Sequence, residues 1–350
     1  MPSPTGPRLV LVPGSGRSGT SALTMALQAL GAAVPPPARP PTEANPRGFG
    51  ETVWIVRHHD VLLRRAGVVH GDARPDAGIR AARAAVGGGH ERRVARRLAR
   101  IEVDSDVVVV KDPQLTWFVD HWLRSAARAG ATPSFALMVR DPAPSAASMG
   151  RHFRAAEPAH LIGGWVNQML HAERATRPGP GRPRRVLVRY PDLLADPRAT
   201  LARIDDRLGL GLLDRAGPTA GPLLRDLIDP ALDRERTRLA DLDLPDGLRT
   251  ITEEVHAALE TLARPGTPED PQVHGALDAL AVRYADLYDR AAGLTASSRL
   301  AAEQQALRLL AQRGSARLRV RAETLRPRHA GPAARRRLGE LAARRRPGAR

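Results

Sequence analysis

The residues from Leu9 to Leu27, LVLVPGSGRSGTSALTMAL, have the composition of a loop that could hold a phosphate group. Gly14, Gly16 and Gly19 would let the main chain approach a ligand closely, and the serines and the threonine beside them carry hydroxyl donors. Such a loop leads from a buried strand into a helix, whose first N–H groups and dipole favour an anion. The question is which phosphate compound this loop binds.

One candidate is a dinucleotide, because the three glycines match the pattern G-x-G-x-x-G. A dinucleotide site also needs an acidic residue about 20 residues further on, at the end of a second strand, to hold the ribose. Glu43 has roughly this separation, but it lies in the proline-rich segment PPPARPPTEANPRGFG, with no strand before it. The dinucleotide hypothesis is therefore disfavoured.

A second candidate is the nucleotide loop of kinases, since Gly14 and Gly19 have the glycine spacing of a Walker A motif. That motif places lysine before Ser/Thr, where the ammonium bridges the β and γ phosphates. Here Thr20 and Ser21 follow Gly19 directly, so the lysine is absent. Asp112, after the apolar run VVVV and Lys111, could still hold Mg²⁺. An ATP-dependent small-molecule kinase stays open as an alternative.

In the third candidate the cation lies inside the loop. GRSGTS places Arg17 among main-chain donors and hydroxyls at the start of a helix. This segment resembles the phosphosulfate loop of sulfotransferases that use 3′-phosphoadenosine 5′-phosphosulfate (PAPS), many of which have lysine at this position. The resemblance implies a donor site formed by Gly16, Arg17, Ser18, Gly19, Thr20 and Ser21.

Two later segments match the same family. MVRDPAPSAASMGRHF places Arg140 at the end of a strand and Ser148 eight positions later, and the resemblance implies that both bind the 3′-phosphate of PAPS. VRYPDLLADP resembles a further family segment, which implies that Tyr190 approaches the adenine. The R-K-G-x-x-G motif of eukaryotic cytosolic members is absent, and Arg234 or Arg236 could replace its contact.

The resemblance also implies a catalytic centre. ANPRGFGE resembles a bacterial sulfotransferase segment that delivers an acid to the reaction, which makes Glu51 the general base. His58 and His59 are rival bases. Lys111 is the only lysine in the chain, and many family members carry lysine after this strand, near the transferring sulfuryl group.

The mechanism that this resemblance implies is in-line transfer of a sulfuryl group from PAPS to a hydroxyl, or less favourably an amine. The acceptor would be a carbohydrate or another small molecule, and the product PAP (3′-phosphoadenosine 5′-phosphate) would be released. Arg17, Lys111 and loop N–H groups would stabilise the growing charge, so no metal is expected.

Charge and composition limit which other functions the protein could have. The formal net charge is +17 and the pI is about 11.5, which keeps a non-catalytic nucleic-acid-binding protein as an alternative. Aromatic residues make up only 3% of the chain, so a base-stacking platform is not expected. The absence of cysteine excludes thiolate chemistry. No apolar run is long enough to predict a membrane span, and we expect a cytoplasmic protein.

The periodicity predicts an α/β fold of the P-loop-like, three-layer kind, with a central, mainly parallel sheet flanked by helices and a helical C-terminal region. Expected strands cover 8–12 and 107–110, with two more ending near Arg140 and Tyr190. A helix is expected over 51–65, and another from Thr295 to about Arg313. We expect a catalytic domain over 1–292 and, over 293–350, a helix followed by an arginine-rich, disordered tail.

Overall fold

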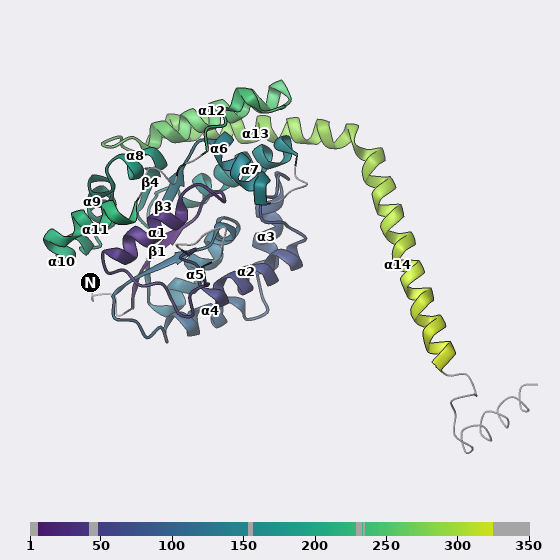
Figure 1. Ribbon diagram of the computed structural model, residues 1–350, viewed down its shortest axis with the longest axis horizontal. Coiled ribbons are helices and arrows are strands. Elements are labelled where there is room, and N and C mark those ends of the chain that lie inside the picture. Colours follow the sequence, from purple (N-terminus) through teal and green to yellow (C-terminus); the bar gives the residue numbers. More distant parts are fainter. Residues whose placement is uncertain (1–5, 42–47, 153–156, 229–232, 234, 325–350) are drawn as a thin grey trace, which may run out of the picture. The chain divides into compact units, whose positions relative to one another are not determined.

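The computed structural model describes residues 6–41, 48–152, 157–228, 233 and 235–324. The chain divides into two units, residues 1–288 and 289–350, which are traced in Figure 1. The helix α13 (Pro271–Leu294) runs across this division, and α14 (Ala296–Thr324) lies within the second unit. The domain border that the sequence suggests at 292 stays a prediction.

The first unit is built on a parallel sheet of four strands within the described residues. These are β1 (Arg8–Val12), β2 (Val107–Lys111), β3 (Thr132–Val139) and β4 (Arg185–Arg189), in the order β2-β1-β3-β4. The α/β fold with a parallel sheet is thus confirmed. Since the strands are parallel, their carboxyl ends all lie at one edge of the sheet, where ligands bind in folds of this class.

Helices connect and cover the strands (Figure 1). In the first unit they are α1 (Thr20–Ala29), α2 (Val53–Ala66), α3 (Ala77–Ala85), α4 (His90–Leu98), α5 (Val119–Ala129), α6 (Pro142–His152), α7 (Pro158–Thr176), α8 (Tyr190–Ala195), α9 (Pro197–Leu208), α10 (Leu212–Ala216), α11 (Ala220–Leu227) and α12 (Asp246–Ala263). Short 3₁₀ turns cover η1 (Pro113–Phe118), η2 (Gly217–Thr219) and η4 (Leu239–Asp241).

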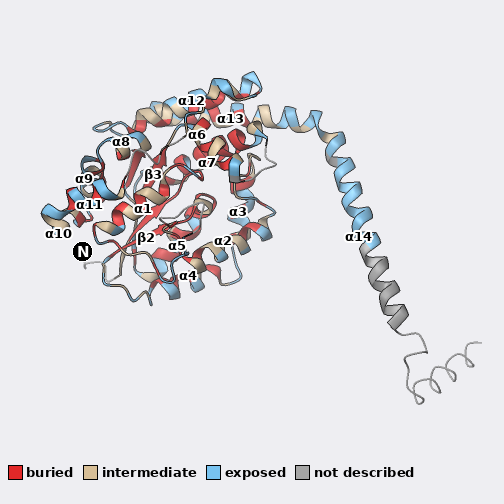
Figure 2. Cartoon of the chain, viewed as in Figure 1, coloured by how far each residue is buried: buried red, intermediate tan, exposed pale blue. Residues whose placement is uncertain are grey.

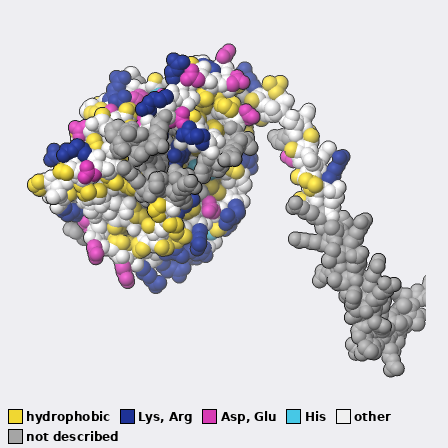
Figure 3. All heavy atoms as spheres, in the orientation of Figure 1, with side chains coloured by type: hydrophobic (Ala, Val, Ile, Leu, Met, Phe, Trp, Pro, Cys, Tyr) yellow, Lys and Arg dark blue, Asp and Glu magenta, His cyan; other side chains and the backbone are white. Residues whose placement is uncertain are grey.

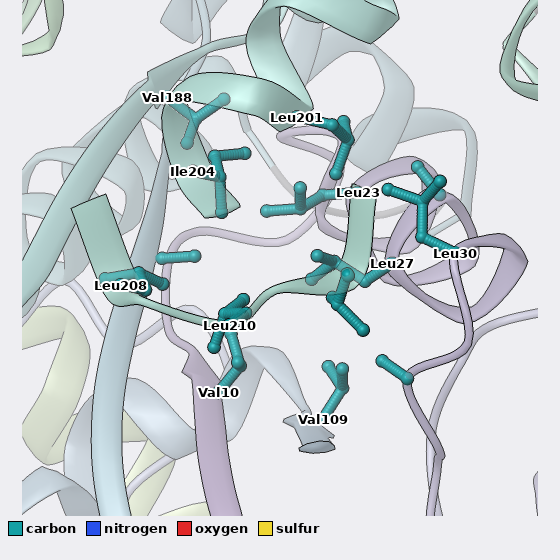
Figure 4. Close-up of a cluster of buried hydrophobic side chains, with 14 of the residues drawn as sticks. Val10, Leu23, Leu27, Leu30, Val109, Val188, Leu201, Ile204, Leu208 and Leu210 are labelled. Carbon is teal, nitrogen blue, oxygen red and sulfur yellow. The ribbon is translucent and has the colours of Figure 1, made fainter. Parts of the chain in front are cut away.

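Alternate side chains of each strand enter different cores, because successive residues of a strand point to opposite faces. Val10 and Val109 pack with leucines of α1 and α9 on one face (Figure 4). Leu11 and Val110 pack against α2 to α5 on the other face. Both faces of the sheet are therefore covered, and Figure 2 shows the strands buried among helices whose outer sides are exposed.

Two boundaries differ from the sequence-based expectation. Helix α2 begins at Val53, because an isolated antiparallel bridge between Ala38 and Thr52 holds the preceding residues in extended form. Helix α14 continues to Thr324, beyond the expected end near Arg313. The part of the expected disordered tail from residue 325 onward lies outside the described residues.

A buried ion-pair network ties β4 to α7. The guanidinium of Arg185 and the carboxylate of Glu173 are both fully buried, with Nη2 3.2 Å from Oε1. Arg185 also lies 2.6 Å from Glu269, and Arg177 lies 2.6 Å from Glu173. A buried charge that loses its partner is costly, so each member of this network depends on the others.

We predict that Glu173→Gln lowers the free energy of unfolding by about 3 kcal/mol, because it leaves buried guanidinium charge without full compensation. Urea unfolding followed by circular dichroism measures the effect. The matched control is Glu91→Gln, whose partners Arg124 and Arg128 are exposed. It should cost less than about 1 kcal/mol. Equal losses in the two variants would contradict the prediction.

Candidate active site

The loop between β1 and α1 is fixed by its own polar groups. Thr116 of η1 accepts a hydrogen bond from the Gly14 N–H at 2.9 Å and donates to the Gly14 carbonyl at 3.1 Å. Ser18 Oγ donates to the Ser15 carbonyl at 2.6 Å. Arg17 has a φ of 63°, the left-handed conformation that side-chain-bearing residues rarely adopt. The surrounding bonds hold this strained residue in place, as is common at functional sites.

The first turn of α1 is free of side-chain caps and acidic residues. Its N-terminal flank is Gly19, which makes no capping hydrogen bond, and no acid occurs in the first turn. The leading N–H groups of the helix are therefore available to an anion. Gly19 has a φ of 91°, and a Cβ placed there would lie 2.3 Å from the ring of Tyr190. Only glycine allows this approach.

Three arginines converge beside the loop. Arg17 Nε donates to Ser148 Oγ at 2.9 Å, and Arg140 Nη1 donates to the Arg17 carbonyl at 2.7 Å. The Arg140 guanidinium lies 4.4 Å from the centre of the Tyr190 ring. Partial burial, followed by the charges of Arg140 and Arg151, lowers the pKa of Arg17. The sequence-predicted residues Arg17, Arg140, Ser148 and Tyr190 are thus brought together, in surroundings that favour an anion.

Acidic side chains balance part of this charge. Arg140 pairs with Asp233, and the exposed Arg151 pairs with Glu235. Arg236 also faces Asp233, at 3.6 Å, but its side chain is 74% exposed. Arg234, its alternative in the sequence analysis, lies outside the described residues.

Lys111 and Glu51 form a buried pair at the end of β2. Lys111 Nζ donates to Glu51 Oε1 at 2.7 Å, to Ser21 Oγ at 3.1 Å and to the Phe49 carbonyl at 3.2 Å. The other carboxylate oxygen of Glu51 accepts from Arg39 at 2.8 Å. The sequence-predicted residues Glu51, Lys111 and Ser21 therefore meet at the start of α1, with Glu51 placed before α2 and not within it.

The rival base His59 is part of the protein's interior. It is fully buried, and Trp122 Nε1 donates to its Nε2 at 2.8 Å. Because an indole nitrogen only donates, Nδ1 must carry the proton that is shared with Asp112 Oδ2 at 2.7 Å. Burial acts to raise the pKa of Asp112, but the bonds from His59 and the Gln114 main chain lower it overall. Both nitrogens of His59 are thereby occupied.

The other rival, His58, is paired with His121 at 3.0 Å between Nε2 atoms. Burial and neighbouring histidines lower the pKa of His58 to about 3, and burial lowers that of His121 to about 4. Both rings are therefore neutral near pH 7, and they pack between α2 and α5. Neither His58 nor His59 contacts the loop residues through a hydrogen bond that the structure shows among its described residues.

Several site residues carry no recognisable motif in the sequence. Arg39 and Thr116 contact the site from a proline-rich loop and a 3₁₀ turn. Arg151 was identifiable only as the residue one helical turn after Ser148. His70, whose Nε2 would lie 3.0 Å from a Cβ on Gly16, had no signal at all.

Basic residues also gather away from this site. Figure 3 shows arginine side chains along the lower edge of the view, where α4 lies in Figure 1. A hollow there, of about 580 Å³, is lined by Arg92, Arg93, Arg96 and Arg128. Within the described residues, no group of three or more histidine and acidic side chains could hold a metal ion. No described helix is long and apolar enough to cross a membrane.

The chain is similar to a known protein family and to two solved domains. A family model described as "Sulfotransferase family" matches residues 7–214, which contain the loop, Lys111, Arg140 and Tyr190. The sulfotransferase domain of the Synechococcus PCC 7002 olefin synthase is 20% identical, with 81% of this chain and 97% of that domain covered and a TM-score of 0.38. The sulfotransferase domain of the curacin biosynthetic pathway is 16% identical, with coverage of 79% and 98% and a TM-score of 0.35. A search of curated proteins gave no match. Since the family model spans more than half of the chain, the protein belongs to the sulfotransferase family, whose members generally use PAPS as donor.

Proposed function

We propose that this sulfotransferase transfers the sulfuryl group of PAPS to a hydroxyl, or less favourably an amine, of a carbohydrate or small-molecule acceptor. The observation that carries the proposal is the juxtaposition of two cationic sites. One consists of the uncapped start of α1 with Lys111 and Arg17, and the other of Arg140 with Ser148. A donor with phosphates at both its 5′ and 3′ positions suits this pair of sites.

The two sites divide the donor between them in our proposal. The 5′-phosphosulfate is held by Gly16 to Ser21 through main-chain N–H groups and hydroxyls. The 3′-phosphate is held by Arg140 and Ser148, with Arg140 exchanging Asp233 for the phosphate. Tyr190 packs against Gly19 and Arg140, which supports a position for its ring beside the adenosine.

The reaction is an in-line displacement at sulfur. The acceptor oxygen forms the new S–O bond, and the bond from sulfur to the bridging oxygen of the 5′-phosphate breaks. Arg17 and Lys111 stabilise the charge that grows on the bridging oxygen, in a place fixed before the donor binds. Lys111 Nζ already lies 3.1 Å from Ser21 Oγ, so its ammonium stands beside the start of α1, where the donor would bind.

Glu51 positions Lys111 in this proposal, because its carboxylate holds the ammonium at the start of α1. The resemblance to bacterial sulfotransferases implies that Glu51 is the general base. For that role one of its oxygens must first be released, because Lys111 and Arg39 each occupy one.

The kinase alternative predicts that Asp112 holds Mg²⁺. Its Oδ1 accepts from the Gln114 N–H at 3.0 Å and its Oδ2 lies 2.7 Å from His59. Both oxygens are committed to the scaffold, which supports the sulfotransferase proposal over a metal-dependent kinase.

We predict that PAP stabilises the protein against heat in the presence of EDTA and that AMP, which lacks the 3′-phosphate, does so less. At a concentration one hundred times Kd, PAP should add about 2.7 kcal/mol. Arg140→Ala should weaken PAP binding about 10-fold to 100-fold, since a hydrogen bond to a charged group contributes about 1.5–3 kcal/mol. Thermal shift and titration calorimetry provide the measurements.

The control variant is Arg128→Ala, which removes an exposed arginine of α5 and should bind PAP as the parent protein does. No stabilisation by millimolar PAP would refute the proposal. Stronger, Mg²⁺-dependent stabilisation by ATP would favour the kinase.

A second prediction concerns Gly19. Gly19→Ala places a methyl group on the Tyr190 ring, which should displace Tyr190 and Arg140 and weaken PAP binding at least 10-fold. Gly31→Ala is the matched control, because Gly31 also has a positive φ, of 99°, but nothing lies within 4 Å of its Cβ position. Both variants carry backbone strain of about 1–2 kcal/mol. Calorimetry should show that only Gly31→Ala keeps the affinity for PAP, and equal affinities would exclude this account.

A further inference from the structure

His70 lies in a turn between α2 and α3 whose main chain is held from several sides. Its carbonyl accepts hydrogen bonds from Gln168 Nε2 at 2.8 Å and from Trp117 Nε1 at 3.2 Å. Asp72 accepts from the N–H groups of Val69 and Arg74, both at 3.0 Å. The position of His70 is therefore set by contacts of the main chain, and its side chain contributes nothing to them.

The same turn is fastened to α7 and α13. Asn167 Nδ2 donates to the carbonyls of Asp72 and Arg74 at 2.8 and 2.7 Å. The hydroxyl of Tyr284 donates to the Ala73 carbonyl at 2.6 Å. A turn this firmly supported can present a side chain with little freedom, which is what a reacting group requires.

The imidazole of His70 is presented to the phosphate loop. A Cβ added at Gly16 would lie 3.0 Å from Nε2 of His70 and 3.4 Å from the sulfur of Met149. The ring is half-buried, and neither nitrogen forms a hydrogen bond with another described residue. A polar ring at the edge of the site thus has unused hydrogen-bonding capacity.

The charges around His70 suit a group that gains a proton during the reaction. Burial is the largest influence on His70 and lowers the pKa of its ring, which favours the neutral form. The carboxylates of Asp112, Glu51 and Asp60 raise the pKa of His70, and the charge of Lys111 lowers it further. The resting ring can therefore accept a proton, and nearby carboxylates stabilise the imidazolium that forms.

Glu51, by comparison, is not free to accept a proton in the resting protein. Each of its oxygens is ion-paired, to Lys111 at 2.7 Å and to Arg39 at 2.8 Å. Protonation would weaken both pairs and release Lys111 from its place at the start of α1. His70 has no such commitment.

We propose that His70 is the catalytic base that receives the acceptor's proton, while Glu51 keeps Lys111 in position. The inference rests on the sulfuryl transfer proposed above. The O–H bond of the acceptor breaks as its oxygen attacks sulfur, and the proton passes to an imidazole nitrogen. The electron pair of the broken S–O bond leaves with PAP. The acceptor is then a compound whose hydroxyl is protonated when it binds and must lose its proton during the reaction. An acceptor that is already an oxyanion would not need this base.

The test measures PAP release from PAPS with three acceptors: water, phenol and 4-nitrophenol at a pH where it is ionised. His70→Gln should lower the rate with water and with phenol about 100-fold or more, the usual contribution of a general base. It should leave the rate with 4-nitrophenolate within a few fold, because that acceptor has no proton to lose. His160→Gln, on the exposed start of α7, is the control histidine variant.

The pH profile and chemical rescue add readouts that a structural role would not change. With phenol, kcat/KM of the parent should fall below a pKa that lies under 6.5, as His70 becomes protonated. His70→Gln should lose this acid limb, and added imidazole should restore activity to His70→Gly. Equal losses with phenol and 4-nitrophenolate, or an acid limb that persists in His70→Gln, would overturn the proposal.

Folding and donor binding are checked by calorimetry with PAP. If PAP binds neither the parent nor His70→Gln, the proposed function itself fails. If PAP binds both equally but the parent and His70→Gln transfer the sulfuryl group to phenol at the same rate, the assignment of His70 as base fails while donor binding stands.

Discussion

Positive charge gathered at one edge of the sheet is the constraint around which the site is built. Each strand places one side chain of the site at or just beyond its carboxyl end. These are Arg17 after β1, Lys111 in β2, Arg140 after β3 and the uncharged Tyr190 after β4. Parallel pairing brings these four positions together, although up to 173 residues of sequence separate them. Three cations in so small a region repel one another, which is unfavourable without an anion or compensating contacts. The fold supplies those contacts from outside the strands.

The compensating contacts differ in strength between the two ends of the site. Near Lys111 they are buried, since Lys111 and Glu51 keep only 3% and 6% of their side-chain surface exposed. Near Arg140 they involve Asp233, which is 23% exposed, and the face of the Tyr190 ring. A partly exposed pair is easier to separate than a fully buried one. A ligand phosphate can therefore displace the partner of Arg140 at lower cost than that of Lys111. This difference suits binding at Arg140 and chemistry beside Lys111.

The sheet was predictable from sequence because it depends on local patterns, whereas the candidate site residues were indicated by resemblance to sulfotransferase segments. Apolar runs marked the strands, and the polar residues that follow them marked the edge where they meet. Glu51 was placed wrongly at a helix start, because its conformation depends on pairing with the Pro37–Arg39 segment. No sequence motif marked His70 as a site residue, because its turn is held by Gln168, 98 residues further along the chain. The contact of the buried Arg185 with Glu269, 84 residues further along the chain, likewise joins distant segments. Such contacts leave no periodic mark in the sequence.

The single lysine shows how composition and geometry combine. Basic positions in this chain number 54, and all but Lys111 are arginine. Lys111 Nζ has three hydrogen-bond partners, namely Ser21 Oγ, the Phe49 carbonyl and Glu51 Oε1, and an ammonium group has exactly three protons to donate. A guanidinium has five donors in a plane, so in this buried place it would leave donors unsatisfied and would not match partners arranged around a point. Arginine serves at Arg17 and Arg140, where the site is open and phosphate oxygens can be bound side by side. At Lys111 the space is closed, and the requirement for a compact cation explains why lysine stands there in a chain that otherwise uses arginine.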